Sequence, residues 1–172
     1  MKINKYKDPK SSLVLFGLDD KLDFLINLYN ANNFPKVLML TGKKGIGKFT
    51  LLNHFLNYVY DKKNYDLKTK SINSQSKFYK QYLKDIFTNI IYLSGSNYKN
   101  IKVDDIRHLK SQIFKTSILE NKRFIILDDI EIFNTNSLNA LLKIIEEPSL
   151  ENYFILINNE TKPLIKTIKS RS

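Results

Sequence analysis

Residues 41–50 read Thr-Gly-Lys-Lys-Gly-Ile-Gly-Lys-Phe-Thr, and this stretch decides the fold. The apolar run 37–40 before it predicts a buried parallel strand, and residues 51–59 after it carry apolar side chains at helical spacing. A strand, a glycine-rich turn and a lysine at a helix start favour a phosphate-binding loop, because several backbone N–H groups can then face one anion. The alternative is a chance match in a lysine-rich turn, which the flanking strand and helix disfavour.

The loop has the Walker A spacing but lacks one of its usual residues. A serine or threonine normally follows the lysine and binds Mg²⁺, and this chain has Phe49 there. Thr50 comes one position late, which is about 100° of rotation on a helix. The sequence therefore predicts a loop that holds phosphate while holding Mg²⁺ poorly. The residues predicted for this nucleotide site are Gly42, Gly45, Gly47, Lys48, Phe49 and Thr50.

Bulk composition sets wide bounds on function. The 172 residues suffice for one domain with a real core. Cysteine is absent, so disulfides and a zinc site built on thiolates are excluded. With two histidines in the sequence, we expect no histidine-rich metal site. No run has the length of a membrane span or of a signal peptide, so we expect no membrane contact and a cytoplasmic location.

The net charge of +11 has two interpretations. It favours a polyanionic partner such as DNA or RNA. It also fits a compositional bias toward Lys, Asn, Ile and Tyr, in which case the charge has no partner. Charge alone does not decide between them.

The N-terminal part and residues 61–85 differ in character from the rest. Residues 1–18 predict a basic arm, and Asp19 is predicted to cap a helix that runs to about Asn32. Residues 61–85 combine lysines with aromatic residues, which could grip single-stranded nucleic acid by charge and stacking. We favour the alternative, a solvated loop followed by a short amphipathic helix.

A second apolar strand, residues 124–127, ends in the carboxylates Asp128 and Asp129. In phosphate-loop proteins such a strand lies beside the first one, and ligands bind at the carboxyl ends of parallel strands. Asp128 is then a candidate to hold Mg²⁺ through water, and Asp129 to orient an attacking water. The alternative is that both residues simply begin a turn.

The C-terminal half continues the alternation of strand and helix. Asn134 or Thr135 is expected to cap a helix that ends at Pro148, and residues 153–157 predict a strand that ends in Asn158 and Asn159. The amides at that end could sense a phosphate or cap a loop. The alternation predicts an α/β fold, a parallel sheet with helices on both faces.

Three motifs follow the phosphate loop. Residues 139–148 look like a "NALLKxLEEP" helix, residues 167–172 like a "TIxSRC" segment with Ser172 for cysteine, and residues 101–107 like an "IxVDxIR" stretch. In type and order these motifs resemble those of the AAA+ clamp-loader subunits of bacterial DNA polymerase III. The resemblance implies a three-layer, RecA-like P-loop NTPase domain over residues 19–172, in a hetero-oligomeric ring that loads the sliding clamp on primer-template DNA.

Within that family the chain resembles the delta-prime type more than the ATP-hydrolysing tau/gamma type. The tau/gamma type has Ser or Thr after the loop lysine and glutamate after the strand aspartate, where this chain has Phe49 and Asp129. The resemblance implies that Arg171 is an arginine finger acting on a neighbouring subunit's ATP, and that Asn159 is the nucleotide sensor. ATP and Mg²⁺ are the implied ligands, with weak or absent hydrolysis by the chain itself.

The chain departs from the family pattern in two further ways. Residues 61–85 fill the place of a cysteine-ligated zinc module without cysteine, and the family's lid and collar domains are not in these 172 residues. Two rival functions stay open: an active AAA+ ATPase in which Thr50 supplies the missing hydroxyl, and a nucleic-acid-binding P-loop module that uses residues 61–85.

Overall fold

The computed structural model describes residues 9–96, 111, 122–146 and 151–164. The chain divides into two compact units, one from residues 1–34 and 47–87 and the other from residues 35–46 and 88–172. Each unit is described by itself. The predicted helix that starts near residue 101, Pro148 and the motif at 167–172 lie outside the described residues.

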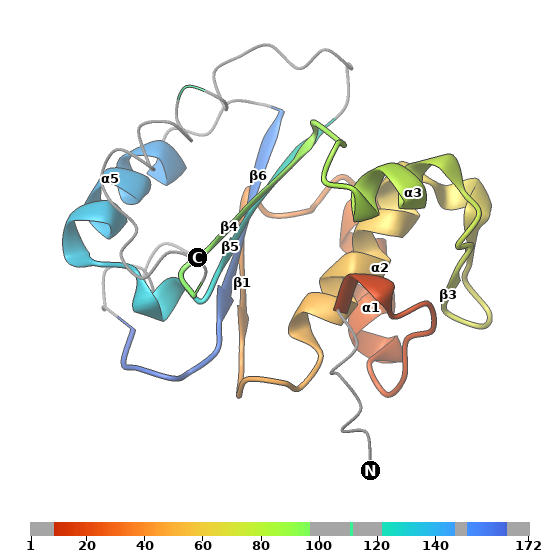
Figure 1. Ribbon diagram of the computed structural model, residues 1–172, viewed down its shortest axis with the longest axis horizontal. Helices are drawn as coiled ribbons and strands as arrows, with labels where there is room; N and C mark the ends of the chain where they lie inside the picture. The colour runs from red at the N-terminus through yellow and green to blue at the C-terminus, as the bar shows by residue number, and fades with distance from the viewer. Residues whose placement is uncertain (1–8, 97–110, 112–121, 147–150, 165–172) are drawn as a thin grey trace. The chain divides into compact units, whose positions relative to one another are not determined.

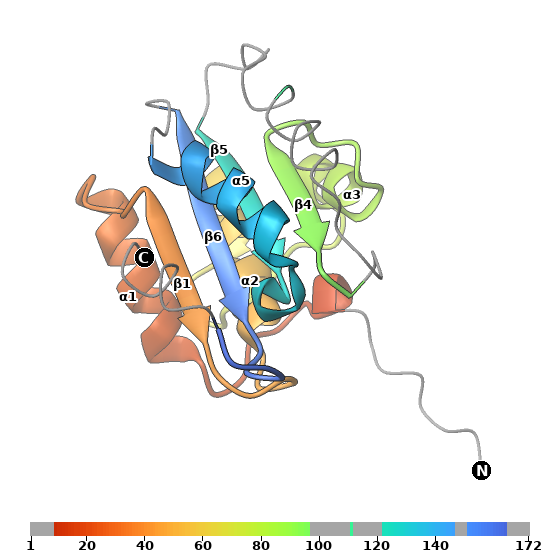
Figure 2. The ribbon, with the colours of Figure 1, turned by 90° about the vertical axis from the view of Figure 1, so that its left-hand side faces the viewer.

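The second unit is built on a four-stranded parallel sheet, in which the strands stand in the order β1-β6-β5-β4 (Figure 2). The strands are β1 (Val37–Thr41), β4 (Ile90–Ser94), β5 (Arg123–Asp128) and β6 (Asn152–Asn158). The predicted α/β fold with a parallel sheet is thus confirmed.

One predicted neighbour in the sheet was wrong. We expected the strand that ends in Asp128 to lie beside β1, but β6 pairs with β1 on one side and with β5 on the other. The burial of the strands explains this order. Every residue of β6 is buried, as a central strand requires, whereas Val37 to Leu40 of β1 are only partly buried.

Helix α5 (Thr135–Glu146) covers one face of this sheet (Figures 1 and 2). Its first turn is capped by Asn134, whose Oδ1 accepts the Ser137 N–H at 2.9 Å, so Asn134 is the predicted cap. Its apolar residues Leu138, Leu141, Leu142 and Ile145 are buried. The core on this face comprises Ile125, Leu127, Ile130, Phe133, Leu138, Leu141, Leu142, Ile144, Ile145, Phe154 and Leu156.

The first unit is organised around α2 (Lys48–Tyr60), which is buried over most of its length. Helix α1 (Asp19–Asn30), helix α3 (Lys77–Leu83) and the short helices η1 (Pro9–Ser11) and η2 (Lys62–Asn64) pack against it (Figure 1). The predicted cap of α1 was wrong, because Asp19 is the helix's first residue and no side chain caps this end. Asp19 instead lies in the first turn, where a negative charge suits the helix dipole.

Residues 61–85 contain a hairpin that the sequence did not indicate. Strands β2 (Tyr65–Asp66) and β3 (Ser71–Ile72) pair antiparallel, and Asp66 Oδ1 accepts the Lys68 N–H at 2.8 Å within the turn. Two-residue strands carry too little alternation to be recognised. The amphipathic helix expected after the loop is present as α3, and its cap Ser76 accepts the Tyr79 N–H at 3.0 Å.

Residues 13–15 run along this hairpin. The Leu15 N–H donates to Lys70 O at 3.0 Å and the Ile72 N–H donates to Leu13 O at 2.9 Å. Leu15 is buried with 3% of its surface exposed.

Among the described residues, no helix is both long enough and apolar enough to cross a membrane.

Candidate functional site

The predicted phosphate loop falls in both units, so its two parts are described separately. Gly42 and Gly45 follow β1 in the second unit, whereas Gly47 and the start of α2 belong to the first. Gly45 has φ of +89° and Gly47 has φ of +93°. Both values lie in the left-handed region that glycine adopts readily, so the sequence supplies glycine where this turn requires it.

Helix α2 starts with the residues that the sequence assigned to phosphate and Mg²⁺. Gly47 precedes the helix without a side-chain cap, and Lys48 is the helix's first residue, 8% exposed. Phe49 and Thr50 follow and are half-buried. Their roles in nucleotide binding stay predictions.

Asp128 and Asp129 occupy different kinds of position. Asp128 is the last residue of β5, and Asp129 leaves the strand with φ of +52° and ψ of +43°. The Asp129 N–H donates to Asp128 Oδ1 at 2.8 Å. The two carboxylates therefore form one cluster at the carboxyl end of β5.

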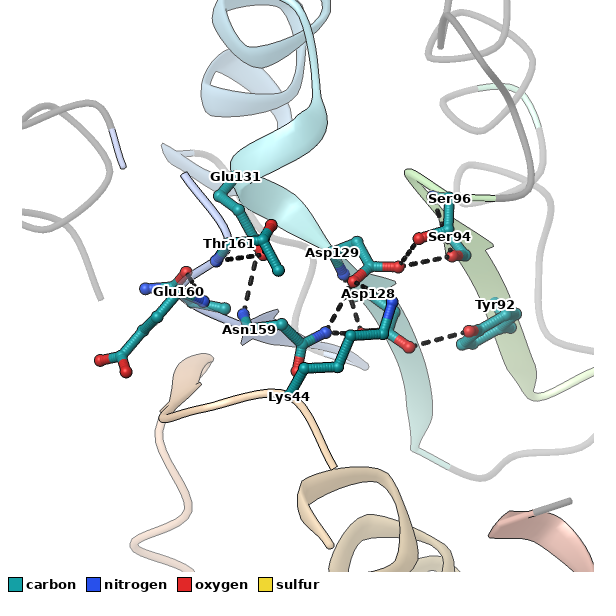
Figure 3. Close-up of polar contacts among 11 residues, drawn as sticks. Lys44, Tyr92, Ser94, Ser96, Asp128, Asp129, Glu131, Asn159, Glu160 and Thr161 are labelled. Carbon is teal, nitrogen blue, oxygen red and sulfur yellow. Dashed lines mark hydrogen bonds and ion pairs between the residues drawn. The ribbon is translucent and has the colours of Figure 1, made fainter. Parts of the chain in front are cut away.

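Asn159 joins both carboxylates, as Figure 3 shows. Its Nδ2 lies 3.1 Å from Asp128 Oδ1 and 2.7 Å from Asp129 Oδ1. Asn159 follows β6, and β6 is the neighbour of β5, so the carboxyl ends of these two strands bring the three side chains together. Of the two amides predicted here, Asn159 is the one in the cluster.

Two serines complete the cluster, and the sequence analysis missed both. Ser94 ends β4 and donates to Asp129 Oδ2 at 3.4 Å, and Ser96 Oγ donates to the same oxygen. Gly95 between them permits the approach, because a Cβ there would lie 2.7 Å from the Asp129 carbonyl oxygen. The available signal was the Ser-Gly-Ser sequence at residues 94–96, which follows a short apolar run.

Lys44 is a further residue that sequence reasoning missed. Its Nζ lies 3.8 Å from Asp129 Oδ1, and its side chain is 63% exposed. An exposed lysine at this distance contributes little to stability. It nevertheless brings a positive charge from the phosphate loop to the carboxylate cluster.

The environment separates the pKa values of the two aspartates. Burial raises the pKa of Asp128, and the neighbouring charge of Asp129 adds to this, although Tyr92 O–H donates to Asp128 Oδ2 at 2.9 Å. Burial would also raise the pKa of Asp129, but hydrogen bonds from Ser96 and Asn159 outweigh it and lower the pKa. Asp129 is therefore the more acidic member of the cluster.

Glu131 fixes the segment that carries Asn159. Its Oε2 accepts the Asn159 N–H at 3.2 Å, and its Oε1 accepts the Thr161 N–H at 3.3 Å and the Thr161 hydroxyl at 2.7 Å (Figure 3). Glu131 is 7% exposed, so these bonds satisfy a buried carboxylate. Nothing in the sequence singled out Glu131, because its partners lie about 30 residues away.

Arg171, the predicted arginine finger, lies outside the described residues. The described part of the chain therefore brings together Asp128, Asp129 and Asn159 from the predicted set. It adds Lys44, Ser94, Ser96, Tyr92 and Glu131.

Comparisons with known proteins place the chain in a family. A family model described as "DNA polymerase III, delta subunit" matches residues 17–172. A DNA polymerase III subunit delta' of Buchnera aphidicola is 30% identical over 149 residues, covering 86% of this chain and 44% of that protein. The subunit delta' of Pseudomonas aeruginosa is 40% identical over 73 residues, covering 42% of this chain and 22% of that protein.

Relatives of a second subunit type also match. A DNA polymerase III subunit gamma of Buchnera aphidicola is 24% identical over 164 residues, covering 95% of this chain and 44% of that protein. The solved structure of a DNA polymerase III gamma subunit-related protein of Thermotoga maritima has a TM-score of 0.44 and 26% identity, covering 57% of this chain and 35% of that one. The chain spans less than half the length of these relatives. Since the family model matches nearly the whole sequence, the chain belongs to the DNA polymerase III delta subunit family.

Proposed function

We propose that the chain is the nucleotide-site portion of a delta'-type clamp-loader subunit. Such a subunit joins other clamp-loader subunits in a hetero-oligomeric ring in the cytoplasm, and the ring loads the sliding clamp on primer-template DNA. The observation that carries the proposal is the family match over residues 17–172. The domain assignment of residues 19–172 to an AAA+ module, after an arm at 1–18, is part of the same proposal.

The proposed subunit hydrolyses ATP weakly or not at all, and the surroundings of Asp129 support this. Oδ1 accepts from Asn159 and faces Lys44, while Oδ2 accepts from Ser94 and Ser96. Both oxygens are thus engaged inside the protein, and the residue is 3% exposed. A carboxylate that already accepts hydrogen bonds at both oxygens has fewer acceptor sites left with which to orient an attacking water.

Nucleotide binding without hydrolysis remains part of the proposal. Lys48 and the glycines of the loop are the groups proposed to hold the phosphates of ATP. Asp128 is proposed to hold Mg²⁺ through water, with Thr50 as the weaker second candidate because Phe49 occupies the usual hydroxyl position. Mg²⁺ would neutralise charge on the phosphates there.

Arg171 is proposed as the group through which the subunit acts on a neighbour. As an arginine finger it would stabilise charge on the phosphate being transferred in the adjacent ATP site. The support is its place in the Ser-Arg-Ser sequence at 170–172, which resembles the family's "SRC" segment.

Reconstitution of clamp loading tests the proposal. The full-length protein that carries this chain is combined with its partner subunits, and the rate of clamp loading on primed DNA is measured. We expect loading to require the protein and Arg171→Ala to lower the ring's ATP turnover by at least about tenfold, since an arginine finger contributes 10³–10⁵ in rate. Clamp loading that proceeds equally well without the protein contradicts its role as a clamp-loader subunit. ATP turnover that is unchanged in Arg171→Ala contradicts the role of Arg171 as an arginine finger.

The second candidate is an active ATPase of the gamma type. The match to a subunit gamma over 95% of the chain favours considering it. It requires Thr50 to replace the missing hydroxyl and Asp129 to release its hydrogen bonds.

A further inference from the structure

A basic groove lies along α3, away from the carboxylate cluster in sequence and in the other unit of the chain. Its volume is about 280 Å³. Three lysines, two glutamines and one isoleucine line it, and no acidic side chain does. The lining residues are Gln75, Lys77, Lys80, Gln81, Lys84 and Ile86.

The three lysines form one row of positive charge. Lys77 and Lys80 lie three residues apart on one face of the helix, and Lys84 follows as the residue that ends it, so the row spans about 10 Å at 1.5 Å per residue. All three are exposed. Within the part of the chain that the structure describes, none of their ammonium groups forms an ion pair or a hydrogen bond.

The neighbouring acid does not neutralise this row. Asp85 follows Lys84 in the sequence, but its carboxylate pairs with Lys10. Lys10 also lies over the ring of Tyr82, with Nζ 5.1 Å from the centroid, on the buried side of α3. Within the described residues, no carboxylate therefore pairs with the lysines of this row.

The aromatic residues of α3 anchor the helix and are not available to a ligand. Phe78, Tyr79 and Tyr82 are 7%, 4% and 3% exposed. Stacking of bases on these rings, which the mixture of lysines and aromatics in this segment suggested, is therefore excluded for the described conformation. What α3 offers is a fixed helix that presents cations and amides.

We propose that this groove binds the phosphate backbone of nucleic acid and does not read its bases. Phosphates follow one another at about 3.4 Å along the axis of a DNA strand, so a row of about 10 Å faces about three of them. Lysine ammonium groups and glutamine amides donate hydrogen bonds that phosphate oxygens can accept. Because the three aromatic rings of α3 are buried and cannot stack on bases, single-stranded and duplex DNA bind to the groove through the same contacts. The groove lies outside the nucleotide site, so this proposal stands whether or not ATP is hydrolysed.

Salt dependence of DNA binding tests the groove. Binding of a fluorescent duplex of mixed sequence is measured between 50 and 200 mM salt for the wild-type chain and for Lys77→Gln/Lys80→Gln/Lys84→Gln. The loss of three phosphate contacts should make the negative slope of log K against log salt shallower by about 2.7. Between 50 and 200 mM salt the affinity of the wild type should therefore fall by a factor about 40 times larger than that of the variant. Wild-type protein that does not bind the duplex overturns the proposal.

A matched variant separates the groove from net charge. Lys21→Gln/Lys63→Gln/Lys68→Gln removes the same charge from exposed residues of the same unit, outside the groove. We expect its slope to stay close to the wild-type slope. An equal loss in both triple variants shows that charge acts non-specifically and overturns the proposal.

Poly-glutamate supplies the remaining comparison, because an acidic protein segment is the other ligand that such a groove could hold. If the groove variant loses binding to poly-glutamate while its binding to DNA is unchanged, the groove is a protein-docking surface and the proposal fails. Thermal unfolding of each variant verifies that the exposed substitutions leave the fold intact.

Discussion

Asn159 Nδ2 lies 2.7 Å from Asp129 Oδ1, and this hydrogen bond ties the residue after β6 to the residue after β5. The same amide donates to Asp128, so one side chain holds two carboxylates that would otherwise repel each other. The candidate site is therefore a network centred on Asn159, with the buried Asp129 at one end.

Replacing Asn159 should destabilise the second unit through these carboxylates. Asn159→Ala removes both donated hydrogen bonds, and we expect it to lower the free energy of unfolding by about 1–3 kcal/mol. Asn159→Asp should cost more, because it puts a third carboxylate against the other two. Denaturant unfolding at neutral pH measures both variants, and an Asp variant as stable as the Ala variant would contradict this account of the cluster.

Glu131 is predicted to hold the segment 159–161 in place. Glu131→Ala leaves the Asn159 and Thr161 N–H groups without their acceptor, so we expect it to lower the free energy of unfolding by about 2–3 kcal/mol. Hydrogen exchange of these two amides should become faster. Glu160→Gln, at an exposed neighbour, is the control and should change neither quantity; unchanged exchange in Glu131→Ala would show that the segment is held by other contacts.

Gly95→Ala tests whether the end of β4 must approach Asp129 so closely. The added Cβ would lie 2.7 Å from a backbone oxygen and about 3.1 Å from the ring of Phe133, so one of them has to move. We expect a loss of about 1–3 kcal/mol in the free energy of unfolding. Thermal unfolding that matches the wild type would mean that this turn adjusts without strain.

Much of the fold could be predicted because its signals are local. The apolar runs 37–40, 124–127 and 153–157 identified strands β1, β5 and β6 to within a residue or two, and Asn134 was one of the two residues predicted to cap α5. The order of the strands was harder to predict, because it depends on which strand pairs with a neighbour along both of its edges. The two-residue strands β2 and β3 gave no periodic signal at all.

The candidate site was predicted in part. Asp128, Asp129 and Asn159 follow strands, so the rule that ligands bind at the carboxyl ends of parallel strands predicted where they lie. Ser94, Ser96 and Glu131 depend on long-range contacts from ordinary loop residues. No spacing in the sequence distinguishes such residues from solvated ones.

His54 should make the stability of the first unit depend on pH. Its Nε2–H donates to Ser12 O at 3.1 Å, and its Nδ1 lies 3.0 Å from the Tyr65 hydroxyl, from which it accepts when the ring is neutral. Burial lowers the pKa of His54 from 6.5 to about 4, although the hydrogen bond to Ser12 opposes this shift. The native state therefore disfavours the proton that the unfolded chain takes up.

The sign of the effect follows from that difference. The stabilisation is complete above pH 6.5 and is lost progressively as the pH falls toward 4, by at most about 1.4 kcal/mol per pH unit. Unfolding curves at pH 7.5, 6 and 5 measure it, with His54→Gln as the control that lacks the titrating group. If the difference between the two proteins does not vary over this range, the ring does not titrate as the buried network requires.

The most direct test of the account is Mg²⁺-dependent ATP turnover by the purified full-length protein and by its Asp128→Ala variant. Because Asp129 is engaged through both oxygens and Phe49 replaces the usual hydroxyl, we predict that wild-type turnover does not exceed that of Asp128→Ala. Mg²⁺-dependent turnover that Asp128→Ala abolishes would contradict the account and identify the chain as part of an active ATPase.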